Sequence, residues 1–277
     1  MIGRVATQAE KGKAFRALHE RDAAFIIPNP WDIGSAHVLA HLGFEALATT
    51  SMGYALSIGK RDTMVGRDAM LEHIAAIANA TALPVNADLE NGYGDDPATV
   101  AETIRLAAAV GVVGGSIEDA TGRADDPIYD RDFAVERVRA AAAAARALPF
   151  TFTLTARAEN YLHGRPDLAD TIERLKAYER AGADVLYAPG LRSKDDIAAV
   201  VHALDRPVNV LMGLQGVLLS LAELSTIGAR RISVGSALYR AAMGAFLRAA
   251  CEMRDDGTFG FAADAASPRD IDKTFPK

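Results

Sequence analysis

Charged residues end three short apolar runs in the middle of the chain. Asp88 and Glu90 stand two residues apart, as do Arg157 and Glu159, and Glu118 ends the run between these pairs. Side chains two apart on a β-strand point to the same face, so both members of each pair can face one space. The spacing therefore predicts carboxylates and a guanidinium gathered at the ends of neighbouring strands.

Carboxylates that converge in this way repel one another unless a cation lies between them. An all-oxygen site suits Mg²⁺ or Mn²⁺, which keeps several waters and takes few protein ligands. A single carboxylate is better explained as a helix cap or an arginine partner. Carboxylates on three adjacent strands with Arg157 beside them favour a metal site.

Other chemistries find little support. A Schiff-base aldolase requires a lysine on a strand, but every lysine falls in a predicted helix, a loop or a terminus. The lysines are Lys11, Lys13, Lys60, Lys176, Lys194, Lys273 and Lys277. His37 and His41 lack the intervening glutamate of a zinc protease and are predicted to pack a helix or lie on the surface. The single cysteine, Cys251, is predicted to be buried in an alanine-rich helix.

The elements that must position these residues alternate between strand and helix along the chain. The predicted strands are Phe25 to Asn29, Ala46 to Ser51, Val85 to Glu90, Gly114 to Asp119, Thr151 to Arg157, Asp184 to Gly190, Val208 to Met212 and Arg231 to Gly235. The clearest predicted helices are Asp68 to Thr81, Pro97 to Val110, Phe133 to Ala147 and Leu168 to Ala181.

Eight such repeats predict an α/β protein with a single (β/α)8 TIM barrel, because that number of parallel strands closes a barrel. An open doubly wound sheet is the alternative, but no GxGxxG turn follows the first strand. We expect residues 1–277 to form one domain, in which 237–277 is a C-terminal helix and tail. In a barrel the active site lies at the carboxyl ends of the strands, where the acids stand.

The composition excludes several classes of protein. The net charge of -6 and the absence of a Lys/Arg-rich run argue against nucleic-acid binding. No apolar stretch is long enough for a membrane span, and the N-terminus reads as a charged amphipathic helix rather than a signal peptide. We expect a cytoplasmic protein with no membrane partner.

Five motifs, in order, resemble the isocitrate lyase / phosphoenolpyruvate mutase superfamily. They are PNPWDIGSAHVLAHLGFEALATTSMGYA at the first two strands, GKRD ending in Asp62, NADLENGYG with Asp88 and Glu90, SIEDA with Glu118, and TARAEN with Arg157 and Glu159. Glu90 stands where many members have a second aspartate. The resemblance covers nearly the whole barrel and implies the same fold.

The resemblance also implies roles for the acids. Asp88 would bind Mg²⁺ directly, while Asp62, Glu90 and Glu118 would hold waters of its coordination shell. A small 2-oxo acid would complete that shell through its carboxylate and keto oxygens. A metal and a guanidinium together stabilise the enolate that forms when the bond next to the carbonyl breaks.

The substrate contacts follow from the same resemblance. Ser51, the backbone around Met52 and Gly53, and Arg157 would donate hydrogen bonds to the 2-oxo acid. Asn209, on the seventh strand, is expected near the distal end of the substrate. Arg157, Glu118 and Ser51 are the expected catalytic residues, and Glu159 is expected to contribute to substrate binding.

The chain departs from the superfamily after the fourth strand. Isocitrate and methylisocitrate lyases carry a KxCGH-type loop whose cysteine acts in proton transfer, whereas this chain has EDATGRADDPIYDRD. The segment also differs from the loops of phosphoenolpyruvate mutase and phosphonopyruvate hydrolase. What remains are oxaloacetate decarboxylase-like proteins and members without an assigned reaction. Residues Thr121 to Asp130 are either a short lid or a simple connector.

Three functions follow from this comparison. The first is a Mg²⁺-dependent carbon–carbon lyase or decarboxylase acting on a 2-oxo or 2-hydroxy di- or tricarboxylate through an enolate. The second is phosphorus–carbon chemistry on phosphonopyruvate or phosphoenolpyruvate. The third is a 2-oxo acid binding protein without turnover.

The resemblance further implies a homotetramer in which the helix after the eighth strand packs on a neighbouring subunit. That segment, Ala237 to Arg254, has one apolar face with Leu238 and Phe246 as its large members. The helical pattern alone favours a helix that covers its own barrel. The tail after Gly257 is expected to lie along the surface or around a partner.

Overall fold

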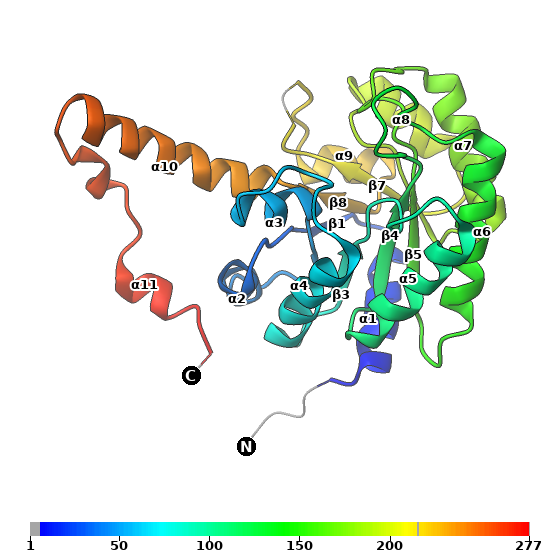
Figure 1. Ribbon diagram of the computed structural model, residues 1–277, viewed down its shortest axis with the longest axis horizontal. Helices are drawn as coiled ribbons and strands as arrows, with labels where there is room; N and C mark the ends of the chain where they lie inside the picture. The colour runs from blue at the N-terminus through cyan, green and yellow to red at the C-terminus, as the bar shows by residue number, and fades with distance from the viewer. Residues whose placement is uncertain (1–5, 215, 277) are drawn as a thin grey trace.

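The strands form one parallel sheet that curves into a barrel (Figure 1). The computed structural model describes residues 6–214 and 216–276, and its strands follow the order β1-β8-β7-β6-β5-β4-β3-β2. The bounds are β1 Phe25–Ile27, β2 Leu47–Ala48, β3 Val85–Asp88, β4 Gly114–Glu118, β5 Thr153–Arg157, β6 Val185–Tyr187, β7 Val208–Leu211 and β8 Arg231–Ser233. All the predicted strands are present, each shorter than its predicted run.

The two ends of this order, β1 and β2, meet along a seam. There the amide of Ala48 donates to the carbonyl oxygen of Pro28 (3.1 Å), and Asn29 Nδ2 donates to the carbonyl oxygen of Thr49 (3.0 Å). Asn29 Oδ1 accepts hydrogen bonds from two amides directly after β8, at 3.0 and 2.9 Å. One asparagine side chain thus joins the ends of β1, β2 and β8, and the predicted TIM barrel is confirmed.

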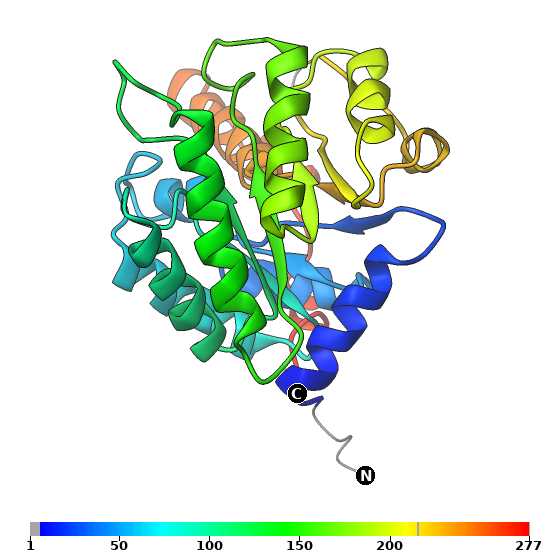
Figure 2. The ribbon, with the colours of Figure 1, turned by 90° about the vertical axis from the view of Figure 1, so that its right-hand side faces the viewer.

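Helices cover the outside of the barrel. Their bounds are α1 Gln8–His19, α2 Ile33–His41, α3 Ser51–Ser57, α4 Arg67–Ala80, α5 Pro97–Ala109, α6 Arg131–Arg146, α7 Leu168–Ala181, α8 Lys194–His202, α9 Leu221–Ile227, α10 Ala237–Asp255, the 3-10 turn η1 Gly260–Ala263 and α11 Pro268–Asp272. Figure 2 shows α5, α6 and α7 side by side over one side of the barrel. The clearest predicted helices therefore lie where the sequence places them.

Capping residues decide where several elements begin. Thr7 and Glu10 form a capping box, so α1 starts at Gln8; residues 1–5 of the predicted N-terminal helix lie outside the described part of the chain. Thr50 accepts a hydrogen bond from the amide of Gly53 and caps α3. Because α3 begins so soon, the predicted strand Ala46 to Ser51 is reduced to two residues.

The core lies between the strands and the helices, and small residues bring its parts together. Buried alanines of α6 let this helix lie close to its neighbours α5 and α7. Helix α1 crosses the amino-terminal end of the barrel, where Phe15 is fully buried. A Cβ at Gly12 would collide with the carbonyl oxygen of Thr151 before β5. Glycine at this position allows α1 to close the floor of the barrel.

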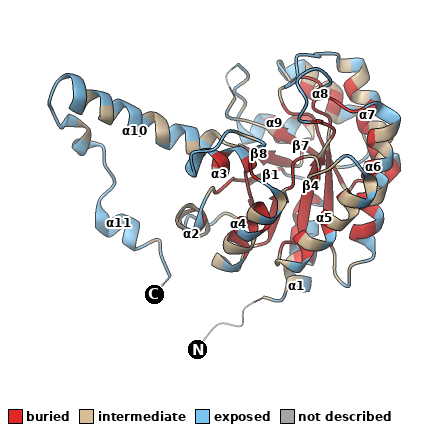
Figure 3. Cartoon of the chain, in the orientation of Figure 1, coloured by how far each residue is buried: buried red, intermediate tan, exposed pale blue. Residues whose placement is uncertain are grey.

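Helix α10 leaves the barrel instead of covering it (Figure 1). Its start is held against the barrel by an edge contact between the rings of Trp31 and Tyr239 at 5.6 Å and by packing on α3. None of its residues is buried, and Phe246 is 62% exposed, as Figure 3 shows for the whole helix. The prediction that Cys251 is buried is wrong, because the helix that carries it projects into solvent.

The tail beyond α10 turns back toward the body of the protein through η1 and α11 (Figure 1). Phe275 makes an edge contact with the ring of His37 on α2, at 5.9 Å. His41, at the end of α2, is exposed. Within the described residues, no helix is long and apolar enough to cross a membrane.

Candidate active site

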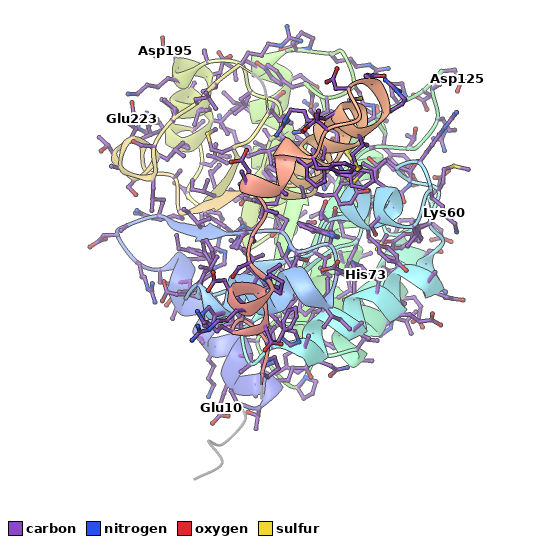
Figure 4. The ribbon with its side chains drawn as sticks, turned by 90° about the vertical axis from the view of Figure 1, so that its left-hand side faces the viewer. Glu10, Lys60, His73, Asp125, Asp195 and Glu223 are labelled. Atoms are coloured by element: carbon purple, nitrogen blue, oxygen red, sulfur yellow. The ribbon has the colours of Figure 1, made fainter. Side chains whose placement is uncertain are left out.

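A cavity of about 1420 Å³ opens at the carboxyl ends of the strands. All but one of the site residues expected from the sequence line it, namely Ser51, Met52, Asp62, Asp88, Glu90, Glu118, Arg157, Glu159 and Asn209. The exception is Gly53, which is buried beneath the cavity wall and donates its amide hydrogen to Thr50 Oγ1. No lysine is among the described lining residues, and Figure 4 shows Lys60 at the edge of the molecule.

Asp88 ends β3 at the centre of this group. Its Oδ2 accepts hydrogen bonds from the amide of Ser51 (3.0 Å) and from Ser51 Oγ (2.8 Å), both at the start of α3. Its own amide donates to Thr49 Oγ1 (2.9 Å). The short β2 and the immediate start of α3 therefore place the first helical turn against the carboxylate of β3, where the amino end of a helix favours negative charge.

Arg157, the last residue of β5, joins the acids of three strands. Its guanidinium lies 3.0 Å from Asp88, 3.1 Å from Glu118 and 2.8 Å from Glu159. Burial alone would lower the pKa of Arg157, but Glu159, Glu118 and Asp88 together raise it well above its usual range. The result is a buried, permanently charged guanidinium in a fixed position.

A sharp turn after β3 returns Glu90 to the cavity. Glu90 (φ 48°), Gly92 (φ 81°) and Tyr93 (φ 61°) all adopt positive φ, which is unfavourable for the two residues that carry a side chain. Burial, with the nearby charges of Asp88 and Asp62, raises the pKa of Glu90 to about 8. Its buried Oε1 has no hydrogen-bond partner within the described structure.

Burial also disfavours the ionised form of the other acids in the cavity. Burial, followed by the charge of Asp88, raises the pKa of Asp62. Burial raises the pKa of Glu118 well above its usual range even though Arg157 is in contact with it. Such carboxylates are short of positive charge, and a cation placed among them would restore their ordinary acidity.

This acid set fits a hydrated Mg²⁺ better than a dehydrated metal. All of the donors are carboxylate oxygens, and Glu90 Oε1 is unsatisfied. Within the described part of the chain, no three Asp, Glu, His or Cys side chains are close enough together to hold a metal by themselves. A cation that takes one or two carboxylates and keeps most of its waters is consistent with both observations.

Behind the cavity, a buried network of polar side chains supports the site. Asp119 faces away from Glu118, as strand alternation requires, and accepts from the amide of Glu159 (2.8 Å), Tyr178 Oη (2.6 Å) and Arg174 (3.1 Å). The sequence analysis assigned no role to Asp119. Its adjacency to Glu118 was a usable signal, because a charged residue on the outer face of a barrel strand must find partners among the helices.

The segment Thr121 to Asp130 folds over the side of the cavity. Ala120 pairs with Ile128 in an isolated antiparallel bridge, and the amide of Thr121 donates to the carbonyl oxygen of Pro127 (2.9 Å). Arg123 then forms an ion pair with Asp95 in the loop after β3 (2.8 Å). The segment is therefore a tightly bonded turn, and its first residues line the cavity.

Comparison with known proteins decides the family. Residues 15–254 match the family model described as phosphoenolpyruvate phosphomutase. The chain belongs to this family. A member with a solved structure, a protein of Burkholderia cenocepacia J2315 provisionally named a lyase/mutase, has 68% sequence identity and a TM-score of 0.94, over 96% of this chain and 95% of its own.

Two further proteins similar to this chain have named reactions. An oxaloacetate acetylhydrolase, solved in complex with the product oxalate, is 30% identical with a TM-score of 0.85, over 97% of this chain and 94% of its own. The oxaloacetate decarboxylase of Chromohalobacter salexigens is 29% identical over 248 residues, which are 87% of this chain and 84% of the relative. The protein is accordingly an enzyme of the phosphoenolpyruvate mutase/isocitrate lyase superfamily, and a carbon–carbon lyase by class.

Proposed function

We propose that the protein is a Mg²⁺-dependent lyase that cleaves a carbon–carbon bond of a small 2-oxo or 2-hydroxy di- or tricarboxylate through an enolate. The observation that carries this proposal is the position of Arg157, which contacts Asp88, Glu118 and Glu159 at one end of the cavity. A fixed positive charge beside clustered acids is suited to a reaction in which negative charge develops on a substrate oxygen.

The acids would hold the metal in two ways, directly and through its waters. Asp88 would hold Mg²⁺ directly, and Asp62, Glu90 and Glu118 would accept hydrogen bonds from its waters. Bound there, Mg²⁺ supplies positive charge beside the keto and carboxylate oxygens of the 2-oxo acid. The raised pKa values of Glu90 and Asp62 support this assignment, since the nearby charge of Arg157 does not offset their burial and the charge of Asp88.

The chain's own residues orient the substrate and stabilise the enolate. Arg157 is held by its carboxylate partners before the substrate arrives, so it can stabilise an enolate oxygen without reorganising. The first turn of α3 borders the same end of the cavity. The amides of Ser51 and Gly53 are already used by Asp88 and Thr50, so Met52 offers the backbone amide for the substrate.

The named relatives favour carbon–carbon cleavage of a 2-oxo dicarboxylate. Both the acetylhydrolase and the decarboxylase are named for oxaloacetate. Oxalate, bound to the acetylhydrolase, presents two adjacent oxygens much as a 2-oxo acid does. Phosphorus–carbon chemistry is the alternative function, because the matched family is described as phosphoenolpyruvate phosphomutase.

A substrate panel tests the proposal. Purified protein is incubated with oxaloacetate, methylisocitrate and substituted malates, with Mg²⁺ and with a chelator, and pyruvate-like products are measured. We expect turnover of at least one acid that the chelator abolishes. Phosphate release from phosphonopyruvate, with no turnover of the carbon acids, would assign phosphorus–carbon chemistry instead. Tight oxalate binding by calorimetry with no turnover of any acid would indicate a binding protein.

A further inference from the structure

A second arginine lies inside the barrel, and the reaction above does not use it. Arg231 begins β8 and is only 3% exposed. Its Nε donates to Asn209 Oδ1 (2.9 Å), and one terminal nitrogen donates to Thr155 Oγ1 (2.9 Å). The other terminal nitrogen is buried without a hydrogen-bond partner in the described structure.

Arg231 lacks the carboxylate partners that Arg157 and Arg174 have. Arg157 contacts three acids, and Arg174 contacts Asp119 and Asp170. Within the described part of the chain, Arg231 forms no ion pair, and burial lowers its pKa to about 10. The guanidinium is still charged at neutral pH, so the barrel holds a buried positive charge without a counter-ion, which is costly.

This charge belongs to the same cavity as the acids. Glu118, Arg157, Tyr187, Asn209 and Arg231 are successive register partners on β4 to β8, and all of them line the cavity. Residues in register on neighbouring strands face the same side of a sheet, here the interior of the barrel. The cavity therefore has acids suited to a cation at one end of this row and an unpaired guanidinium at the other.

We propose that Arg231 binds the distal carboxylate of a 2-oxo dicarboxylate whose keto-acid end lies at Asp88 and Arg157. This inference rests on the proposed function, because it takes the position of the keto-acid end from it. Asn209 and Thr155 hold the guanidinium in place, and its unpartnered nitrogen supplies the free donor. A carboxylate there would satisfy that donor and neutralise the buried charge.

Matched ligands isolate the distal carboxylate. Calorimetry in the presence of Mg²⁺ compares 2-oxo dicarboxylates of four to six carbons with 2-oxo monocarboxylates of the same length, such as 2-oxoglutarate with 2-oxopentanoate. We expect the wild type to bind the best dicarboxylate roughly 10- to 100-fold more tightly than its monocarboxylate partner. Equal affinities at every length would overturn the proposal.

The variant Arg231→Gln then locates the effect. It should remove the preference for dicarboxylates while the affinity for oxalate, which reaches only the acid end, changes by less than about threefold. Arg231→Lys, which keeps the charge, should retain part of the preference. If the preference survives in Arg231→Gln, the distal carboxylate binds elsewhere and the proposal is wrong.

Two controls keep the outcome interpretable. If the wild type binds no oxalate with Mg²⁺, the proposed function fails first, and this result is distinct from oxalate binding without dicarboxylate preference. If Arg231→Gln does not fold, a crystal structure of the wild type with Mg²⁺ and the preferred dicarboxylate decides. A carboxylate oxygen within hydrogen-bonding distance of Arg231 supports the proposal. Chloride or water at that nitrogen, with the carboxylate elsewhere, contradicts it.

Discussion

Asp88 and Arg157 lie in contact at the centre of the candidate active site, and the partners of Arg157 make Asp88 suitable for mutagenesis. Arg157 keeps two carboxylate partners, Glu118 and Glu159, when Asp88 is removed. Loss of Asp88 therefore leaves no buried unpaired guanidinium at this site. Function and folding can be separated at this residue.

We predict that Asp88→Ala lowers Mg²⁺-dependent turnover about 100-fold or more, because it removes the carboxylate that would hold the metal. The far-UV circular dichroism spectrum and the melting temperature should change little. Asp195→Ala, at the exposed start of α8, is the matched control for loss of an aspartate. Metal-dependent turnover that survives in Asp88→Ala would exclude Asp88 as the ligand.

A buried histidine gives the fold a pH dependence of its own. His19 packs against the rings of Phe15 and Phe25, and burial, with the charge of Arg231 as a further cause, lowers its pKa to about 3. The unfolded chain binds a proton at His19 near pH 6.5, whereas the folded chain does not. Its contribution to stability is therefore complete above pH 6.5 and is lost as the pH falls toward 3.

We predict that His19→Phe weakens this dependence. Between pH 6 and 4 the free energy of unfolding of the wild type should fall more steeply than that of the variant, by up to about 1.4 kcal/mol per pH unit. Urea unfolding at several pH values measures both slopes. The same substitution at the exposed His41 is the control, and equal slopes for His19→Phe and the wild type would contradict the assignment.

At the scale of elements, α1 depends on close approach to the barrel floor. Gly12→Ala should destabilise the protein by roughly 1–3 kcal/mol, because its Cβ would meet the carbonyl oxygen of Thr151. Gly34→Ala on α2 is the matched control, since the nearest atom to its Cβ would be a flexible Asp32 oxygen at 3.6 Å. If thermal melts show Gly34→Ala to be less stable than Gly12→Ala, then α1 can shift away from Thr151 to accommodate the added Cβ.

The sequence predicts the elements better than the directions of their side chains. Strand runs and acid spacing locate β3, β4 and β5 with Asp88, Glu118 and Arg157 at their ends. The inward position of Arg231 was not predicted, because it depends on the register of the five strands β4 to β8 rather than on local pattern. The backbone around Gly53 was predicted to donate a hydrogen bond to the substrate, but the amide of Gly53 already donates to Thr50 in the cap of α3.

The course of α10 could not be predicted for a related reason. An apolar face at helical spacing is the same whether the helix covers its own barrel or leaves it. Cys251 was expected to be buried on that basis and is exposed. What decides the course of the helix is how its first turn, near Tyr239, packs on Trp31, and this contact joins residues far apart in the chain.

For the whole molecule, we propose a homotetramer in which α10 packs on a neighbouring subunit. The exposed side chains of Phe246 (62%), Leu247 (57%) and Met253 (42%) support this, because a projecting helix rarely leaves such residues in water. Light scattering at micromolar concentration should give about four times the chain mass of 29.3 kDa. A stable monomer would refute the proposal that α10 packs on a neighbouring subunit.

Variants of α10 test which face is used. Phe246→Asp should shift the protein toward monomers, whereas Arg248→Ala, two residues along, should not. Truncation after Gly235 should yield insoluble or partly unfolded protein, because assembly and folding would then be inseparable. A truncated chain that is monomeric, folded and active would show that α10 is dispensable.

The seam between β1 and β2 is the place where we expect the barrel to open locally. At this seam, side-chain hydrogen bonds of Asn29 take the place of continuous backbone pairing between strands. We therefore expect β1 and β2 to separate there while the pairing of β3 to β8 stays intact. The amides of Val234 and Gly235, which donate to Asn29, should exchange with deuterium through local opening, and Asn29→Ala should accelerate their exchange but not that of β4 or β5. Because Asn29, Val234 and Gly235 also line the cavity, we expect each such opening to connect the cavity to solvent through the wall of the barrel.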